Sequence, residues 1–102
     1  MKILENKKKL DNLLEKIRVQ DLKIGLIPTM GSIHEGHISL IEQSKHSNCF
    51  SIVTIFVNPT QFNNLEDFNN YPKNKEEDIN RLKQAECDAL YFPQTQELYP
   101  SE

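Results

Sequence analysis

The sequence lacks the features of membrane, secreted and nucleic-acid-binding proteins. The longest apolar run, Ile52 to Val57, is interrupted by Thr54 and is far too short to span a bilayer. The lysines near the N-terminus are not followed by a continuous apolar segment, so no signal peptide is expected. With 12 basic and 15 acidic residues the formal net charge is −3, which does not suggest a broad basic surface for nucleic acid.

Cysteine and glycine are also scarce. The two cysteines, Cys49 and Cys87, could form one disulfide, but two reduced, buried thiols in a cytoplasmic protein are the favoured interpretation. The three glycines do not make the glycine-rich fingerprint of dinucleotide-binding proteins. A phosphate-binding feature, if present, must therefore be of another kind.

Helical and strand patterns alternate along the 102 residues, which suffice for one small domain, residues 1–102. Asn6 is a candidate N-cap for a helix running to Val19, whose apolar side carries Leu10, Leu13, Leu14 and Ile17. Lysines 7–9 are interpreted as the solvated side of this helix, with a nucleic-acid patch as the alternative. Further helices are predicted over residues 33–45 and 75–85, and strands over 23–28, 50–57 and 88–92.

This order predicts an α/β fold, a Rossmann-like parallel sheet with flanking helices that corresponds to half of a doubly wound sheet. The strand from Lys23 to Pro28 is almost continuously apolar, so we expect it to be buried on both faces. In the helix that follows, we expect Ile38, Leu40 and Ile41 to be buried.

The stretch from Ile24 to Ile41, IGLIPTMGSIHEGHISLI, reads as strand, tight turn and helix. His34 and His37 are three residues apart, so they share a helix face, and Gly36 between them leaves room for a ligand. A helix start has unpaired N–H groups and a positive dipole end, which together favour a phosphate. The alternatives for the pair are Zn²⁺ ligands, although no third ligand is evident nearby, or ordinary polar surface groups.

Two other polar segments have both a functional and a structural interpretation. The segment from Asn58 to Tyr71 follows a strand end, where Asn58 and Gln61 suit a substrate with hydroxyl and carboxylate groups, or it is an ordinary surface loop. The acidic run of residues 76–78 is interpreted as stabilising a helix start by charge–dipole attraction, with an Mg²⁺ site as the alternative.

Four strings carry a resemblance to a known family. PTMGSIHEGH resembles the His-x-Gly-His signature of the nucleotidyltransferase superfamily, which includes class I aminoacyl-tRNA synthetases. IFVNPTQF, EDFNNYPK and ELYP follow in the order and spacing of one of its members, the pantothenate synthetase (pantoate–beta-alanine ligase) family. The resemblance extends from Lys23 to the end of the chain.

The resemblance implies ATP-dependent ligation of pantoate and beta-alanine through a pantoyl adenylate, with Mg²⁺ accompanying the ATP phosphates. It implies that His34 and His37 are catalytic, with His37 as the proton donor to the leaving group. The residues implied to bind ATP are Met30, Gly31, Ser32, Ile33, His34, Glu35, Gly36 and His37. Those implied to bind pantoate or beta-alanine are Gln61, Met30, Asn58 and Pro28.

The sequence departs from the family pattern at three positions. It has Ile33 where the family has leucine, Asn63 where it has glycine and Lys73 where it has arginine. Family members are also much longer, and their second half carries lysine–aspartate–glutamine and serine–serine–arginine segments that clamp the phosphates. We therefore expect this chain to correspond to the N-terminal part, with the strand from Lys23 exposed as a sheet edge. We expect the isolated chain to fold, to bind ATP weakly, to self-associate and not to catalyse the ligation.

The resemblance further implies a cytoplasmic enzyme whose partners are small molecules, without nucleic acid or membrane, and a homodimer at full length. Two other functions remain open from the sequence. One is another nucleotidyltransferase with the same His-x-Gly-His core. The other is a nucleotide-binding module without catalysis.

Overall fold

The computed structural model describes residues 1–56 and 75–92, and every structural statement below refers to these two ranges. The strands are β1 (Lys2–Leu4), β2 (Lys23–Thr29), β3 (Cys49–Ile55) and β4 (Ala89–Tyr91). The helices are α1 (Lys7–Val19), α2 (Glu35–His46) and α4 (Lys75–Gln84).

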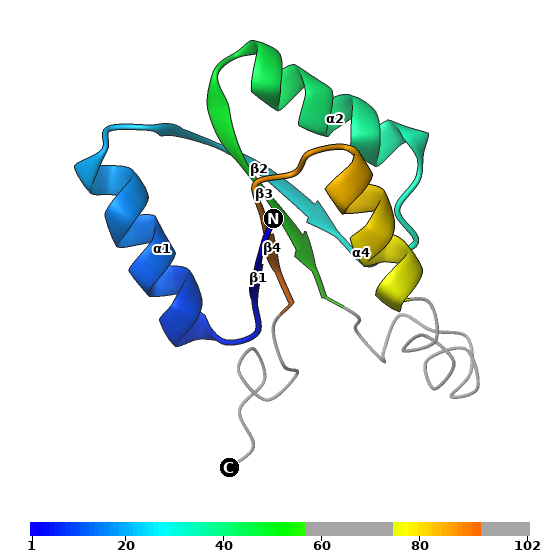
Figure 1. Cartoon of the computed structure of the whole chain (residues 1–102), viewed down its shortest axis with the longest axis horizontal. Helices are drawn as coiled ribbons and strands as arrows, with labels where there is room; N and C mark the ends of the chain where they lie inside the picture. Colours follow the sequence, from blue (N-terminus) through cyan, green and yellow to red (C-terminus); the bar gives the residue numbers. More distant parts are fainter. Residues whose placement is uncertain (57–74, 93–102) are drawn as a thin grey trace.

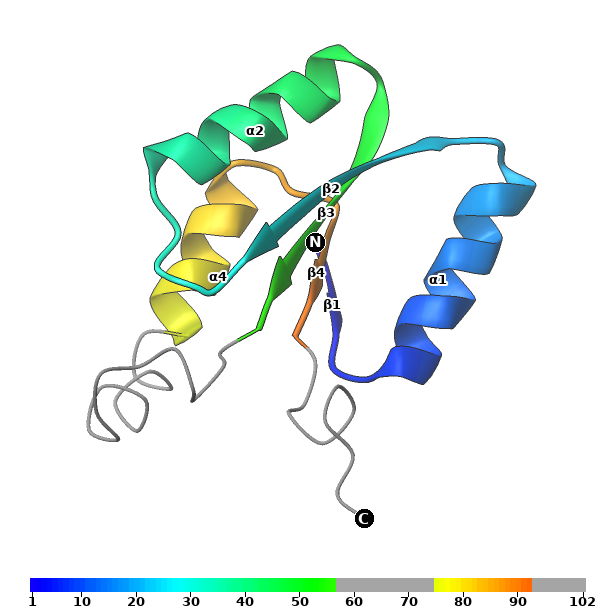
Figure 2. The same ribbon diagram turned by 180° about the vertical axis from the view of Figure 1, so that it is seen from behind.

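The four strands form one parallel sheet in the order β1-β4-β3-β2 (Figure 1). The chain crosses the sheet in one direction from β1 to β2 and then returns through β3 to β4. Right-handed crossovers made in opposite directions place their helices on opposite faces. Accordingly, α1 covers one face while α2 and α4 lie together on the other, as both views show (Figures 1 and 2). The predicted α/β class and half of a doubly wound sheet are confirmed.

Each face of the sheet has its own apolar core. On the α1 face the core consists of Leu4, Leu13, Ile17, Ile52, Ala89 and Tyr91. On the α2 and α4 face it consists of Ile27, Ile33, Ile41, Val53, Ile55, Leu82, Cys87 and Leu90. The central strands β3 and β4 contribute to both, which explains why their side chains are buried on the two faces.

The helix α1 forms as its sequence predicts. The side chain of Asn6 accepts a hydrogen bond from the backbone N–H of Lys9 at 2.9 Å, which caps the helix start. Leu13 and Ile17 are buried, and Leu10 and Leu14 pack against them. None of the helices in the described ranges is long and apolar enough to cross a bilayer.

The prediction that the strand from Lys23 is buried on both faces is wrong. This strand, β2, lies at the edge of the sheet, and α1 covers the other strands rather than β2. Ile24 is therefore 44% exposed and Leu26 62% exposed, while Ile27 on the opposite face is buried. The edge position itself agrees with the expectation from the family resemblance.

Several smaller expectations also need correction. The strand β1 was not predicted, because three residues beside charged ones give too short a pattern. Leu40 was expected to be buried but is 46% exposed, since it faces the open side of β2.

The helix α2 begins at Glu35 rather than at residue 33, because Ile33 precedes the cap and inserts its side chain into the core. Both cysteines are free thiols, as expected, but only Cys87 is buried, which raises the pKa of its thiol, while Cys49 is half-buried.

Candidate functional site

The turn between β2 and α2 has an unusual backbone. Gly31 has φ of 96°, and Ser32 also lies in the left-handed region with φ of 55°. Glycine adopts such angles freely, but a serine there is uncommon and needs support from its surroundings. The Thr29 hydroxyl accepts a hydrogen bond from the Gly31 N–H at 3.1 Å, which tightens the turn.

The two histidines cap α2 reciprocally. His34 is the N-cap, and its Nδ1 accepts a hydrogen bond from the Gly36 N–H at 3.0 Å. His37, in the first turn, accepts the His34 N–H on its own Nδ1 at 3.1 Å. The two rings stack with centroids 4.0 Å apart and planes 30° apart. This is a capping box built from two imidazoles instead of the more common hydroxyl and carboxylate.

The capping bonds decide where each imidazole holds its proton. An Nδ1 that accepts a backbone N–H carries no hydrogen, so the neutral ring is protonated at Nε2. Burial lowers the pKa of His37, as does the neighbouring His34, while Asp78 acts in the opposite direction. These effects together favour the neutral form of His37, whose hydrogen then lies on Nε2. Because the Nδ1 of each ring accepts a backbone N–H, the Nε2 atoms of both rings remain as the donors at this helix start.

Gly36 lets the ring of His34 lie against the helix start. A Cβ at this position would lie 2.9 Å from Cε1 and 3.1 Å from Nδ1 of His34. Any other residue would thus displace the capping ring. The glycine was expected from the resemblance to admit a ligand, and the structure shows that it also makes room for the first histidine.

Asp78 of α4 holds the turn from a distant part of the chain. Its two carboxylate oxygens accept the backbone N–H groups of Ser32 at 3.1 Å and Ile33 at 2.9 Å. Arg81, one turn along α4, donates to the carbonyl oxygen of Ile33 at 2.5 Å. The sequence interpretation of Asp78 as only a charge at a helix start missed these contacts. A signal was present, because Asp78 and the buried Leu82 are four residues apart and share a helix face.

These contacts change the expected form of the anion site. We expected the unpaired N–H groups around the helix start to receive a phosphate. Those of Ser32, Ile33, His34 and Gly36 instead donate to side chains of the protein. The donors that the described histidines leave for a ligand are their two Nε2–H groups.

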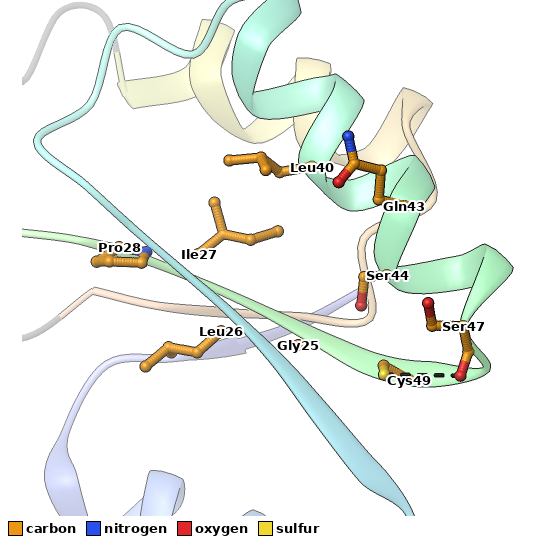
Figure 3. A pocket seen from close by; sticks show the side chains of 9 residues that line it. All are labelled: Gly25, Leu26, Ile27, Pro28, Leu40, Gln43, Ser44, Ser47 and Cys49. Atoms are coloured by element: carbon orange, nitrogen blue, oxygen red, sulfur yellow. Dashed lines mark hydrogen bonds between the residues drawn. The ribbon is translucent and has the colours of Figure 1, made fainter.

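The structure brings the residues from Met30 to His37 together in this one turn, with Met30 49% exposed at its start. Pro28, next to the last residue of β2, lines a hollow of about 300 Å³ between the open side of β2 and the second half of α2 (Figure 3). Leu26, Leu40 and Ser44 also line this hollow. The predicted substrate-binding residues Asn58 and Gln61 lie outside the described residues.

No metal site is formed by the described part of the chain. In residues 1–56 and 75–92 no three His, Cys, Asp or Glu side chains gather closely enough to hold a metal ion.

Comparison with known proteins decides the family. Residues 2–102 match the family model described as pantoate-beta-alanine ligase. The chain belongs to the pantoate-beta-alanine ligase family. It is 43% identical over 100 residues to the pantothenate synthetase of Thermosipho africanus, covering 98% of this chain and 36% of that relative. It is 51% identical over 78 residues to that of Cytophaga hutchinsonii, covering 76% of this chain and 28% of that relative.

Solved structures of the family share the fold. The pantoate-beta-alanine ligase of Francisella tularensis, crystallised with beta-gamma ATP and beta-alanine, superposes with a TM-score of 0.83 at 42% identity. That match covers 99% of this chain and 38% of the other. Pantothenate synthetase from Thermus thermophilus gives a TM-score of 0.70 at 34% identity, covering 99% and 35%. The chain thus spans about a third of the length of the relatives that it matches.

Proposed function

We propose that this chain supplies the nucleotide-binding part of an ATP-dependent ligase that joins pantoate to beta-alanine. In this reaction a carboxylate oxygen of pantoate bonds to the α-phosphorus of ATP, and the bond from that phosphorus to the bridging oxygen breaks. Pyrophosphate leaves and pantoyl adenylate forms. The amine of beta-alanine then bonds to the acyl carbon and loses a proton, while AMP departs, which gives pantothenate.

The observation that carries the proposal is the stacked histidine pair with both Nδ1 atoms occupied. Two Nε2–H donors fixed on one helix start are suited to the oxygens of a polyphosphate, where negative charge increases as pyrophosphate leaves. Donors that are already oriented need no rearrangement when that charge develops. We assign His34 and His37 to this role, with His37 as the donor to the leaving group.

The relatives support the choice of substrates. The Francisella tularensis protein was crystallised with beta-gamma ATP and beta-alanine, and this chain matches it over nearly all of its own length. On that basis we assign Met30 to His37 to the nucleotide. Pro28, Met30, Asn58 and Gln61 are assigned to pantoate and beta-alanine.

Mg²⁺ is proposed to arrive with the ATP phosphates, because Mg²⁺ commonly uses substrate phosphates and retained waters as ligands. The two free cysteines fit the reducing environment of the cytoplasm, which we propose as the location. A homodimeric full-length enzyme stays a prediction. An isolated chain of this length is expected to bind ATP weakly and not to complete the ligation.

Calorimetry of the isolated chain tests the proposal. ATP–Mg²⁺ is titrated into the protein with and without pantoate, and other small carboxylic acids replace pantoate in parallel runs. We expect pantoate to strengthen ATP binding more than the other acids do. His37→Ala should abolish the ATP signal, while the matched control His46→Ala should retain it, since His46 is an exposed histidine at the other end of the same helix.

The outcomes separate the candidate functions. Equal enhancement by unrelated acids would favour another nucleotidyltransferase of the superfamily. ATP binding that no acid alters would favour a nucleotide-binding module without ligation. Retention of full ATP affinity by His37→Ala would contradict the role given to the histidine pair.

A further inference from the structure

We propose that Asp78 is a positioning residue that holds the two histidines in their donor arrangement by fixing the turn before α2. The inference rests on the proposed function, because the arrangement matters for activity only if the two histidines bind ATP. Its structural part, that a carboxylate on α4 controls the histidines on α2, can be tested without any ligand.

The carboxylate of Asp78 is almost completely buried, with the residue 2% exposed. It accepts two consecutive backbone N–H groups, those of Ser32 and Ile33, one on each oxygen. A carboxylate that meets two successive amides in this way orients two neighbouring peptide planes at once. Ser32 has φ of 55°, which a residue with a side chain adopts reluctantly, so this support maintains a backbone shape that would otherwise relax.

Arg81 completes the contact from the same helix. It donates to the carbonyl oxygen of Ile33 at 2.5 Å, and its guanidinium also pairs with Glu77 at 2.6 Å. Ile33 is thus held at its N–H by Asp78 and at its carbonyl by Arg81, while its side chain is fully buried. The helix α4 is itself anchored by Leu82, which is fully buried in the same core.

The connection to the histidines is a single peptide group. The Ile33 carbonyl that accepts from Arg81 and the His34 N–H that donates to His37 belong to the same planar peptide. If that plane rotates, the His34 N–H turns away from His37 Nδ1, and the proton on the His37 ring is no longer confined to Nε2. Asp78 fixes the preceding plane, so its loss frees the whole segment to rotate.

The test uses the ¹⁵N-labelled chain, with histidine tautomers read from long-range ¹H–¹⁵N spectra and ATP–Mg²⁺ affinity from calorimetry. Asp78→Asn keeps the size of the side chain but replaces one acceptor oxygen with an NH₂ group. Glu76→Gln is the matched control, because it removes the same charge from the same helix turn at an exposed residue. Arg81→Gln, at an exposed position, removes only the contact to the Ile33 carbonyl and the pair with Glu77.

We expect the wild type and Glu76→Gln to show His34 and His37 as Nε2–H tautomers. Asp78→Asn should show mixed tautomers and an ATP affinity weaker by about tenfold or more. Arg81→Gln should change the His37 tautomer in the same direction. A folded Asp78→Asn variant with wild-type tautomers would overturn the inference. If that variant does not fold, unchanged tautomers in Arg81→Gln would overturn it.

Failure of the proposed function gives a different result. In that case the wild-type chain does not bind ATP, whereas the tautomers of the Asp78 and Arg81 variants still decide whether α4 positions the histidines.

Discussion

The Nδ1 atoms of His34 and His37 accept backbone N–H groups, and protonation of His37 at Nδ1 must break its capping bond. For His37, burial and the proximity of His34 add to this effect and lower its pKa, although Asp78 opposes them. The chemistry of the site and the stability of the helix start are therefore linked through the same atoms. Two predictions follow from this link, and a third concerns another close contact of the same helix.

The first prediction concerns pH. The ordinary pKa of histidine is about 6.5, and that of His37 is lower in the folded chain. The contribution of His37 to the free energy of unfolding is complete at any pH above its pKa in the unfolded chain. As the pH falls below about 6.5, the unfolded chain binds the proton first and the free energy of unfolding decreases until the pH passes the folded value. An NMR titration of the His37 ring should give a midpoint below about 6.5.

His37→Gln provides the control for this effect. Glutamine at this position of a capping box can accept the N–H of the N-cap residue but does not titrate. Urea unfolding of this variant should lose the part of the pH dependence that belongs to His37. A ring that titrates at or above its ordinary value in the folded wild type would contradict the account.

The second prediction concerns Gly36→Ala. The new Cβ would lie 2.9 Å from Cε1 of His34, so the ring must move away from its cap. Loss of a cap costs about 1 kcal/mol, while alanine in place of glycine in a helix gains about the same. The free energy of unfolding measured in urea should therefore change little, whereas ATP affinity should fall by about tenfold. Ser39→Ala, an exposed change on the same helix, should alter neither quantity. Full ATP affinity in Gly36→Ala would show that the His34 position is unimportant.

The third prediction concerns the close packing of α2 on β2. A Cβ on Gly25 would lie 2.2 Å from Oγ and 2.9 Å from Cβ of Ser44. Gly25→Ala should lower the free energy of unfolding by about 1–3 kcal/mol, the usual cost of overpacking. Ser44 Oγ is buried without a hydrogen-bond partner in the described structure, so Ser44→Ala should cost nothing or stabilise the chain. Chemical denaturation measures the free energy of unfolding of both variants. A Gly25→Ala chain as stable as the wild type would mean that α2 can shift away from β2.

At the scale of helices and strands, local pattern explains much of the fold. The stripe with Leu13 and Ile17, together with the Asn6 cap, predicts α1 with its observed bounds. The order of helices and strands predicts the parallel sheet, and the strand–turn–helix pattern of residues 24–41 predicts that both histidines lie at a helix start. These features depend on residues close together in the sequence, which is why the sequence alone is sufficient for them.

Features that depend on distant contacts could not be predicted in this way. The bonds from Asp78 to Ser32 and Ile33 join positions about 45 residues apart, and nothing in an acidic run specifies such a partner. The burial of a strand depends on what covers it, so the apolar pattern of β2 could not show that Leu26 is exposed. The lowered pKa of His37 depends on its burial and on the neighbouring His34, which only the three-dimensional arrangement provides.

At the scale of the whole molecule, the open side of β2 is the feature with the largest consequences. This seven-residue strand pairs only with β3 within the described sheet. Its uncovered face shows Ile24 and Leu26, and the hollow lined by Leu40 and Ser44 lies alongside it. An exposed apolar edge strand promotes pairing with another chain.

The fourth prediction follows from that edge. Sedimentation velocity of the isolated chain should show concentration-dependent association, and Leu26→Lys should shift the population to the monomer. Val19→Lys is the control, because it makes the same change at an apolar residue that is 73% exposed on α1. A wild-type chain that stays monomeric at all concentrations would contradict the role of the β2 edge. A monomer with full ligase activity would also contradict the expectation that a chain of this length does not turn over.

We propose that the imidazole pair at the start of α2 meets the phosphates of ATP through Nε2–H. The most direct measurement is a long-range ¹H–¹⁵N spectrum of the histidine rings recorded before and after addition of ATP–Mg²⁺. The account predicts that the Nε2 signals of His34 and His37 shift while both rings keep the Nε2–H tautomer and His46 is unaffected. Nucleotide binding that leaves both Nε2 signals unchanged would contradict it.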